Sequence, residues 1–220
     1  MSAIVRTVGR DTLPRTLESL ERQTWRPIEI VVVQAREHLS QAIASSLPLR
    51  VLDGRTLDRP RAANAGLAAA SGEWLIFLDE DDTIEPDHVA SLLGAAMAAR
   101  SPVAYSQTRL VDATGATQRL LGGPFRRELL QRSNYLAIHA VLFSRRFVDQ
   151  GVRFDESLAT FEDWDFWLQL AQRCDFAFLP RPTAIYHAST GNSGAGAGAN
   201  LDREAVLEQR ARLMRKWGLG

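Results

Sequence analysis

The sequence of 220 residues lacks several features that mark special classes of protein. It contains one cysteine, Cys174, which excludes an internal disulfide framework and is typical of a protein of the reducing cytoplasm. It has no apolar run of about 18 residues and no charged-then-apolar leader after Met1, so we expect neither a membrane-spanning helix nor a secretory signal. The 26 Lys and Arg residues balance the 26 Asp and Glu residues, so no net charge favours nucleic acid or an anionic membrane. We therefore expect a cytoplasmic protein without a nucleic-acid partner.

The remaining composition, 45% hydrophobic and 24% charged, is that of an ordinary globular protein. A chain of this length suits one large domain with a substantial core. We expect a single domain over 1–220, made of two halves at 1–100 and 101–190. A low-complexity tract at 190–200, which cannot pack a core and should be mobile, precedes a last, amphipathic helix at 201–220.

Apolar runs and helical patterns alternate through the first hundred residues, and the rhythm then changes. Because the crossovers between parallel strands are right-handed, this alternation predicts an α/β fold with a mostly parallel, Rossmann-like sheet flanked by helices. Beyond residue 100, a turn at Asp112-Ala113-Thr114-Gly115 predicts a hairpin, so we expect a smaller mixed or antiparallel region that holds a second substrate. The expected strands are 3–7, 27–33, 49–52, 74–78, 103–111, 118–121 and 176–186, with an apolar segment at 135–143, and the expected helices are 13–20, 37–46, 62–70, 86–100, 126–132, 161–170 and 201–217.

The most informative stretch is an apolar strand, 74–78, that ends in Asp79-Glu80-Asp81-Asp82-Thr83. Five large apolar residues in a row are typical of a strand buried on both faces. Open α/β sheets bind ligands beyond the carboxyl ends of their strands, and adjacent carboxylates repel one another, so we expect a cation there. Capping of the next helix would explain Asp82 or Thr83 but not Asp79 and Asp81, whose oxygens suit Mg²⁺ or Mn²⁺.

A second carboxylate has an unusual place in the helix expected at 161–170. On a helical wheel, Asp163 falls on the apolar arc, whereas Glu162 and Asp165 fall on the polar arc. Asp163 is either a first-turn acid bonded to backbone amides or a general base at the rim of a cleft. We assign Glu162, on the polar side, to a cap or a supporting role.

His187 follows the strand expected at 176–186 and precedes the tract at 190–200. It is either an ordinary strand-end histidine or a third metal ligand, with the tract closing over substrate as a lid. His38, His88 and His139 are assigned to structural or surface roles.

An ordered set of motifs resembles the family-2 glycosyltransferases of the GT-A fold. The resemblance runs from Ser2 to about His187, and it depends on the order of the motifs more than on any one of them. The motifs are residues 2–10, 17–24, 29–33, Asn64-Ala65-Gly66-Leu67, Gly72-Glu73-Trp74, 77–82, 151–158 and Glu162-Asp163-Trp164-Asp165.

The resemblance implies transfer of a sugar, with inversion, from a nucleotide-diphosphate donor to a hydroxyl group of a glycan, a lipid-linked molecule or another acceptor. The 1–100 half would bind the nucleotide-sugar and the 101–190 half the acceptor. Asp163 would be the base that deprotonates the acceptor. The residues expected around the donor and its divalent metal (Mn or Mg) are Thr7, Gln34, Arg61, Asp79 and Asp81, with His187 completing the metal site.

Three positions depart from the family pattern. The aromatic residue that would flank the base of the nucleotide is Val8, the aspartate that ends the second strand is Gln34, and the arginine before Asn-Ala-Gly is Ala63, with Arg61 or Arg59 as substitutes. These departures leave the identity of the nucleotide open.

The three departures from the family pattern also motivate an alternative function, that of a catalytically inert module that binds a nucleotide or glycan. A third possibility is a haloacid-dehalogenase-like phosphatase, because Asp79 to Thr83 also satisfies Asp-x-Asp-x-Thr. The only lysine, Lys216, lies in the last helix, where it does not suit that chemistry. The last helix packs on the core by default, although peripheral contact with a membrane stays open.

Overall fold

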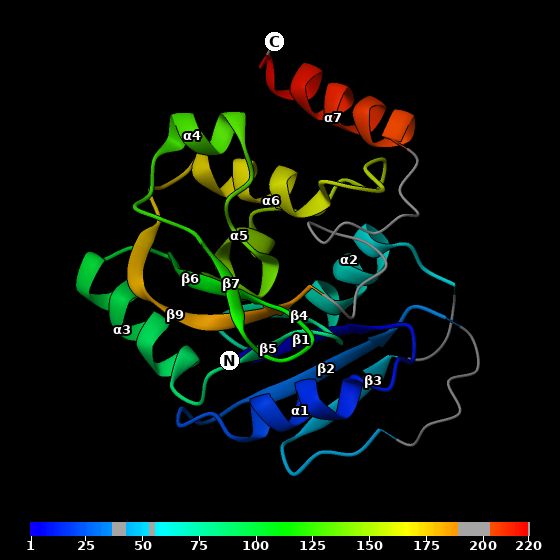
Figure 1. The fold of residues 1–220 in the computed structure, drawn as a ribbon, viewed down its shortest axis with the longest axis vertical. Helices are drawn as coiled ribbons and strands as arrows, with labels where there is room; N and C mark the ends of the chain where they lie inside the picture. The colour runs from blue at the N-terminus through cyan, green and yellow to red at the C-terminus, as the bar shows by residue number, and fades with distance from the viewer. Residues whose placement is uncertain (37–42, 53–55, 189–202, 220) are drawn as a thin grey trace.

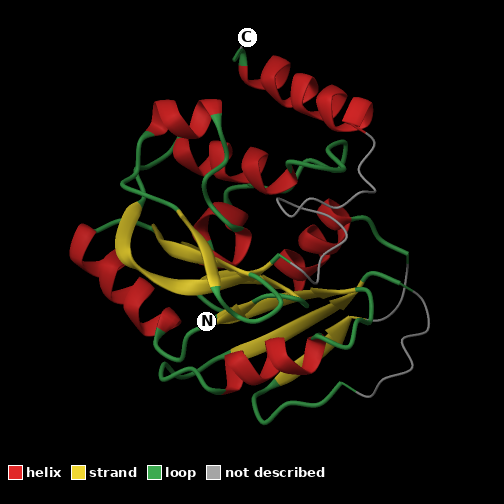
Figure 2. Ribbon diagram, viewed as in Figure 1, coloured by secondary structure: helices red, strands yellow, loops and turns green. Residues whose placement is uncertain are grey.

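The computed structural model describes residues 1–36, 43–52, 56–188 and 203–219. Their nine strands form a single mixed sheet in the order β3-β2-β1-β4-β8-β6-β9-β5, with β7 paired to β6 (Figure 1). Helices cover both faces of the sheet (Figure 2). The α/β fold class expected from the sequence is therefore confirmed.

The N-terminal half of the sheet is parallel. β1 lies between β2 and β4, and β3 extends the sheet beyond β2. Almost every side chain of the three inner strands is buried, as expected for strands with helices on both faces. The four parallel strands are β1 (Ser2–Thr7), β2 (Glu29–Gln34), β3 (Leu49–Leu52) and β4 (Trp74–Asp79).

The C-terminal half of the sheet mixes both directions. β8 is antiparallel to β4 and to β6, and β9 runs parallel to β6 and antiparallel to the short β5. The hairpin expected at the Asp112 turn is formed by β6 and β7. The strands are β5 (Thr83–Ile84), β6 (Val103–Val111), β7 (Thr117–Leu121), β8 (Val141–Ser144) and β9 (Ala177–His187).

Alternate residues of the strands contribute to two cores. One core joins α1 (Leu13–Glu21) and α3 (His88–Ala99) to the sheet. The other core joins the remaining helices to the opposite face, and Phe77 of β4 is at its centre, against Phe143 and Phe154. These helices are α2 (Arg59–Ala69), α4 (Arg127–Arg132), α5 (Arg146–Asp149), α6 (Glu162–Ala171) and α7 (Arg203–Trp217), with a 3₁₀ turn, η1 (Ile138–Ala140).

Two local expectations were wrong. The second large helix begins at Arg59 and not at residue 62, because Asp58 accepts a hydrogen bond from the Arg61 N–H and caps the helix there. Neither Asp82 nor Thr83 caps α3, which is preceded by Asp87, and Thr83 lies in β5.

Two further expectations concern segments that the structure describes in part or not at all. Residues 37–42 of the helix expected at 37–46 lie outside the described ranges, and residues 43–46 are not helical. The tract at 190–200 also lies outside them. Within the described ranges, every helix is too short or too polar to span a lipid bilayer.

Candidate active site

The carboxyl ends of three parallel strands bring the predicted donor residues to one edge of the sheet. In the register of β1 with its neighbours, Thr7 is opposite Gln34 and Arg6 is opposite Asp79. Thr7 and Gln34 are buried at this edge, and the side chain of Asp79 is 29% exposed. The strand ends therefore place Thr7, Gln34 and Asp79 side by side, where open α/β sheets bind ligands.

Asp79 is held by a buried arginine from the neighbouring strand. The Arg6 guanidinium donates from Nε to Asp79 Oδ1 over 2.7 Å and from Nη2 to Asp79 Oδ2 over 2.9 Å. Burial opposes ionisation of Asp79, but the charge and the hydrogen bonds of Arg6 outweigh it, so the pKa of Asp79 is lowered. Asp79 is therefore an ionised carboxylate with both oxygens engaged by protein.

Asp81 has a weaker cationic partner. Arg10, whose side chain is 30% exposed, donates from Nη1 to Asp81 Oδ2. Burial and the charges of Asp82 and Asp79 nevertheless raise the pKa of Asp81 to about 6. Arg10 therefore neutralises only part of the negative charge of the acidic loop around Asp81.

Glu80 fastens the loop that follows β1. Its carboxylate, buried to 4% exposure, accepts hydrogen bonds from the backbone N–H groups of Val8, Gly9 and Arg10 over 2.8 to 3.2 Å. Thr7 Oγ1 also donates to Glu80. This role of Glu80 could not be predicted from the sequence, because nothing local shows that its partners lie some 70 residues away.

Asp82 and His139 form a buried contact beneath the acidic loop. His139 Nδ1 lies 3.0 Å from Asp82 Oδ2, and the backbone N–H of His187 donates to Asp82 Oδ1 over 3.3 Å. Burial lowers the pKa of His139, but the charge of Asp82 outweighs this, and the net shift is upward. His139 thus has a structural role and no place on the surface, and His88 is likewise buried, bonded to Thr183.

The structure brings His187 to the acidic loop, at the end of β9. Its Nε2 lies 3.0 Å from Thr83 Oγ1, and burial lowers its pKa. No group of three His, Cys, Asp or Glu side chains among the described residues is arranged to hold a metal ion. Both oxygens of Asp79 are bound to Arg6, so a divalent ion at Asp79 would have to share them with the guanidinium. The metal roles of Asp79, Asp81 and His187 stay a prediction.

Asp163 lies in the first turn of α6, partly buried. Its Oδ1 accepts the Trp164 N–H over 2.7 Å, and its Oδ2 accepts from Asn134 Nδ2 over 3.0 Å. Burial and the charge of Glu162 raise the pKa of Asp163 to about 7, against the opposing charges of Arg6 and Arg59. A carboxylate that changes charge near neutral pH has the property required of a general base.

The helical wheel misplaced the two other acids of α6. Glu162 is buried and lies 3.3 Å from Arg6 Nη1, and Asp165 is fully buried against Lys216 and Trp217. The physical reason is that α6 is covered on more than one side, by the sheet and by α7. Pairing with cations then makes burial of these acids tolerable.

The two arginines at the start of α2, Arg59 and Arg61, have different partners. Arg61 is bound to Asp58 and Glu156 on the surface, whereas the charge of Arg59 acts on both Asp79 and Asp163. The positive charges of Arg6 and Arg59 therefore act to lower the pKa of both Asp79 and Asp163. Arg61 as a donor residue stays a prediction.

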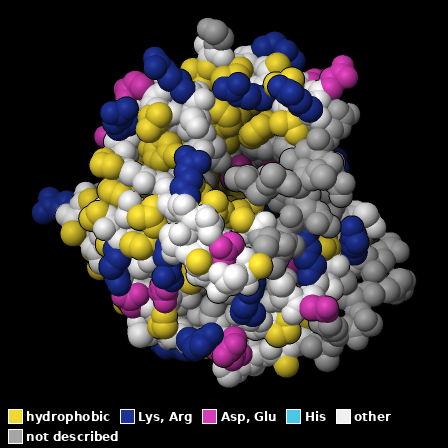
Figure 3. Space-filling view, viewed as in Figure 1, with side chains coloured by type: hydrophobic (Ala, Val, Ile, Leu, Met, Phe, Trp, Pro, Cys, Tyr) yellow, Lys and Arg dark blue, Asp and Glu magenta, His cyan; other side chains and the backbone are white. Residues whose placement is uncertain are grey.

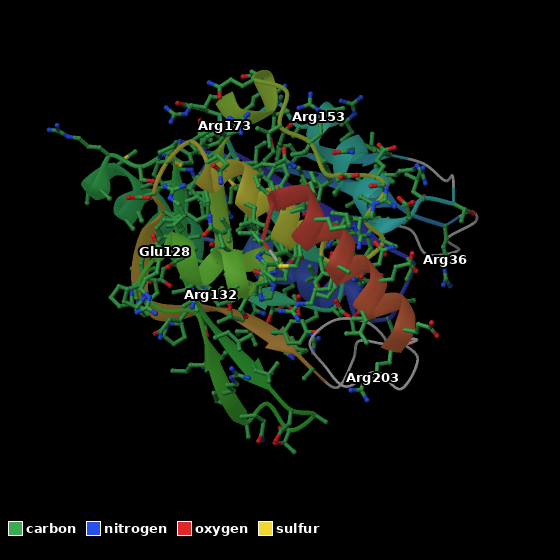
Figure 4. The ribbon with its side chains drawn as sticks, turned by 90° about the horizontal axis from the view of Figure 1, so that it is seen from above. Arg36, Glu128, Arg132, Arg153, Arg173 and Arg203 are labelled. Atoms are coloured by element: carbon green, nitrogen blue, oxygen red, sulfur yellow. The ribbon has the colours of Figure 1, made fainter. Side chains whose placement is uncertain are left out.

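A surface hollow of about 300 Å³ lies elsewhere, on α4, lined by Arg126, Glu128, Leu129 and Arg132. Figure 4 shows Glu128 and Arg132 well apart from Arg36, which follows β2 at the carboxyl edge. Basic and acidic side chains are interspersed over the face in Figure 3, without a field of one sign. The candidate active site is therefore the carboxyl edge of the sheet, where the carboxylates with shifted pKa values lie, and not this hollow.

Comparison with known sequences identifies the family of this chain. Residues 2–153 match the model of the family "Glycosyl transferase family 2". The chain is 31% identical over 204 residues to the succinoglycan biosynthesis protein ExoO of Rhizobium meliloti, covering 83% of this chain and 58% of ExoO. It is 26% identical over 232 residues to the uncharacterized glycosyltransferase YwdF of Bacillus subtilis, covering 100% of this chain and 85% of YwdF.

Solved structures share the fold at low sequence identity. S. aureus TarS 1-349 in complex with UDP superposes with a TM-score of 0.68 and 18% identity, over 97% of this chain and 64% of that one. The mannosyltransferase PcManGT of Pyrobaculum calidifontis, in complex with GDP-Man and Mn²⁺, gives 0.66 and 13%, over 97% and 64%. The chain thus spans less than two thirds of ExoO and of these two structures. From the family match over most of its length, the chain belongs to glycosyl transferase family 2.

Proposed function

We propose that this chain transfers a sugar from a nucleotide-diphosphate donor to a hydroxyl group of an acceptor, with inversion, and that Asp163 is the general base. The observation that carries the proposal is the state of Asp163. Its pKa is raised to about 7, and it feels the same two guanidinium groups, Arg6 and Arg59, that act on Asp79 at the end of β4. A base and a donor-side carboxylate in one electrostatic environment suit a reaction between two bound substrates.

We propose that the donor binds at the carboxyl edge of β1, β2 and β4, and the support for this is that Thr7, Gln34 and Asp79 lie side by side there. Two proteins of the same fold, TarS in complex with UDP-GlcNAc and PcManGT in complex with GDP-Man, support a nucleotide-diphospho-sugar as the class of donor. Val8 and Gln34 stand where the family has an aromatic residue and an aspartate, so the nucleotide has to be found by experiment.

In the proposed step, the oxygen of the acceptor hydroxyl group attacks the anomeric carbon of the donor sugar. Asp163 removes the proton of that hydroxyl group at the same time. The bond from that carbon to the diphosphate breaks on the opposite face, and the configuration inverts. The products are the glycosylated acceptor and a nucleoside diphosphate. Because only the ionised carboxylate can take the proton, activity should rise with pH through about 7, where Asp163 loses its own proton.

A divalent ion, Mn or Mg, stays part of the proposal as a prediction to be tested. The four acids of the loop already have basic side chains beside them: Arg6 at Asp79, Arg10 at Glu80 and Asp81, and His139 at Asp82. An ion at Asp81 would compete with Arg10, which is partly exposed and so can leave without opening the core. Loss of activity in EDTA, restored by Mn²⁺, would support the metal.

For the acceptor, we propose a saccharide, free or lipid-linked, bound by the 101–190 half in the cytoplasm. The relative ExoO is a succinoglycan biosynthesis protein, which supports a role in polysaccharide synthesis. A peripheral membrane contact through α7 would suit a lipid-linked acceptor, since α7 exposes Leu207 among acidic and basic residues.

The proposal is tested by incubating the protein with a panel of UDP- and GDP-linked sugars, with Mn²⁺ or EDTA, and measuring nucleoside diphosphate release. Asp163→Asn is compared with Asp165→Asn, because both acids lie in the first turn of α6 but only Asp163 is expected to touch the acceptor. Loss of release in Asp163→Asn alone supports the base. Binding of a donor without turnover would favour the inert module, and phosphate release from a simple phosphoester would favour the phosphatase.

A further inference from the structure

The side chains of Asp79, Arg6 and Glu162 form a bridge between the two halves of the site, and Arg6 and Glu162 are buried. Arg6 of β1 uses Nε and Nη2 on Asp79 and Nη1 on Glu162, whose Oε1 lies 3.3 Å away. Arg6 Nη1 also lies 3.5 Å from the backbone oxygen of Arg59, at the start of α2. The guanidinium thus links β4, α2 and α6 across 156 positions of sequence between Arg6 and Glu162.

This bridge differs from a surface ion pair because two of its members are buried. The side chains of Arg6 and Glu162 are 7% and 4% exposed. Exposed pairs contribute little, but a buried charge that loses its partner is strongly destabilising, so both ends are held in place. The arrangement also needs arginine, because a lysine has one nitrogen and cannot bind Asp79 through two parallel hydrogen bonds while it also reaches Glu162.

We infer that Arg6 and Glu162 are positioning residues of the proposed reaction: they join the first turn of α6, which carries Asp163, to Asp79 at the end of β4. The inference rests on the proposed function and deepens it. Asp163 is next to Glu162 in α6, so any movement of this turn relative to β4 changes the separation between base and donor. Small misplacements of this kind are costly to catalysis.

The bridge also determines the charges that Asp163 faces. From its own helix it faces Glu162, from β1 Arg6, from α2 Arg59, and from the segment after α4 the neutral amide of Asn134. Glu162 raises the pKa of Asp163, and the two arginines lower it. Glutamine at 162 keeps the shape and still offers an oxygen to Arg6, but it removes the negative charge.

The test is the pH profile of kcat and the donor KM for Glu162→Gln. We expect the acid limb to move to lower pH by about one pH unit, because the carboxylate next to the base is gone while the guanidinium stays. The donor KM should stay within about twofold of wild type, since the paired hydrogen bonds between Arg6 and Asp79 remain. Asp165→Asn is the matched control, because Asp165 is equally buried in the same turn but bonded to Lys216 and Trp217.

An acid limb that stays at its wild-type pH in Glu162→Gln, or that moves equally in Asp165→Asn, would overturn the inference. If Glu162→Gln does not fold, Arg6→Lys tests the same bridge, and folded Arg6→Lys protein should lose at least about tenfold in kcat. Wild-type kcat in that variant would also overturn it. A wild-type protein that turns over no nucleotide-sugar would instead refute the proposed function.

Discussion

Replacing Gly66 by alanine tests how closely α2 packs on the sheet that carries the site. A Cβ atom at this position would lie 2.3 Å from Ile4 Cγ2 and 3.3 Å from Val33 Cγ2. Ile4 is fully buried in the middle of β1, so its side chain cannot swing into solvent. Helix α2 would have to move outward, together with Arg59 and with Asn64, which binds the backbone of Phe154 in the second half.

The size of the effect follows from two opposing contributions. Overpacking of a close-packed core costs about 1–3 kcal/mol. Alanine is preferred to glycine inside a helix by about 1 kcal/mol, which offsets part of that cost. Gly94→Ala in α3 is the matched control, because no atom lies within 4 Å of its added Cβ and only the helix preference acts. The difference between the two variants is therefore the packing cost alone.

Thermal unfolding followed by circular dichroism measures this difference. For a chain of this size, 1–3 kcal/mol corresponds to a Tm for Gly66→Ala roughly 2–12 °C below that of Gly94→Ala. We also expect weaker donor binding in Gly66→Ala, because α2 carries Arg59 to the carboxyl edge. A Tm for Gly66→Ala equal to or above that of Gly94→Ala would show that the contact with Ile4 does not limit packing.

Three further predictions concern charged groups. Asp163→Asn should lower kcat by about 10²–10⁴-fold while the thermal shift produced by donor stays near that of wild type, and loss of that shift would argue for a binding role instead. Asp81→Asn should weaken the Mn²⁺-dependent part of donor binding measured by thermal shift; an unchanged Mn²⁺ effect would contradict the metal prediction. Lys216→Met should reduce the free energy of unfolding by about 1–2 kcal/mol at neutral pH in urea titrations, because Lys216 holds Asp155 and Asp165. The pKa of Asp155 is lowered to about 2, since Lys216 and Ser157 outweigh burial, so the contribution of this pair should persist above the ordinary carboxyl pKa and disappear as pH falls towards 2.

Much of the architecture could be predicted from local patterns. The continuous apolar run before Asp79 predicted an inner strand, and β4 is indeed buried between β1 and β8. The turn at Asp112 predicted the hairpin of β6 and β7. The parallel pairing of β6 with β9 was not predicted, because the partners are separated by more than 70 positions and no local pattern records the pairing.

The interpretation of α6 shows where such reasoning ends. A helical wheel divides a helix into a wet and a dry side, so it placed Glu162 and Asp165 in solvent. In the structure Arg6 arrives from β1 and Lys216 from α7, and both acids are buried with these partners. Burial of a carboxylate depends on its cation, which the wheel does not include.

The sequence by itself determined the alternation of strands and helices, the acids at the tip of β4 and the presence of Asp163 in a first helical turn. All of these follow from side-chain periodicity over a few neighbouring residues. Only the tertiary structure decided which cation neutralises each acid, and hence that Asp163 has a pKa raised to about 7 while Asp79 stays ionised. The reason is that electrostatic interactions depend on distance and burial in three dimensions, and Arg6 meets Asp79 and Glu162 only after the chain has folded.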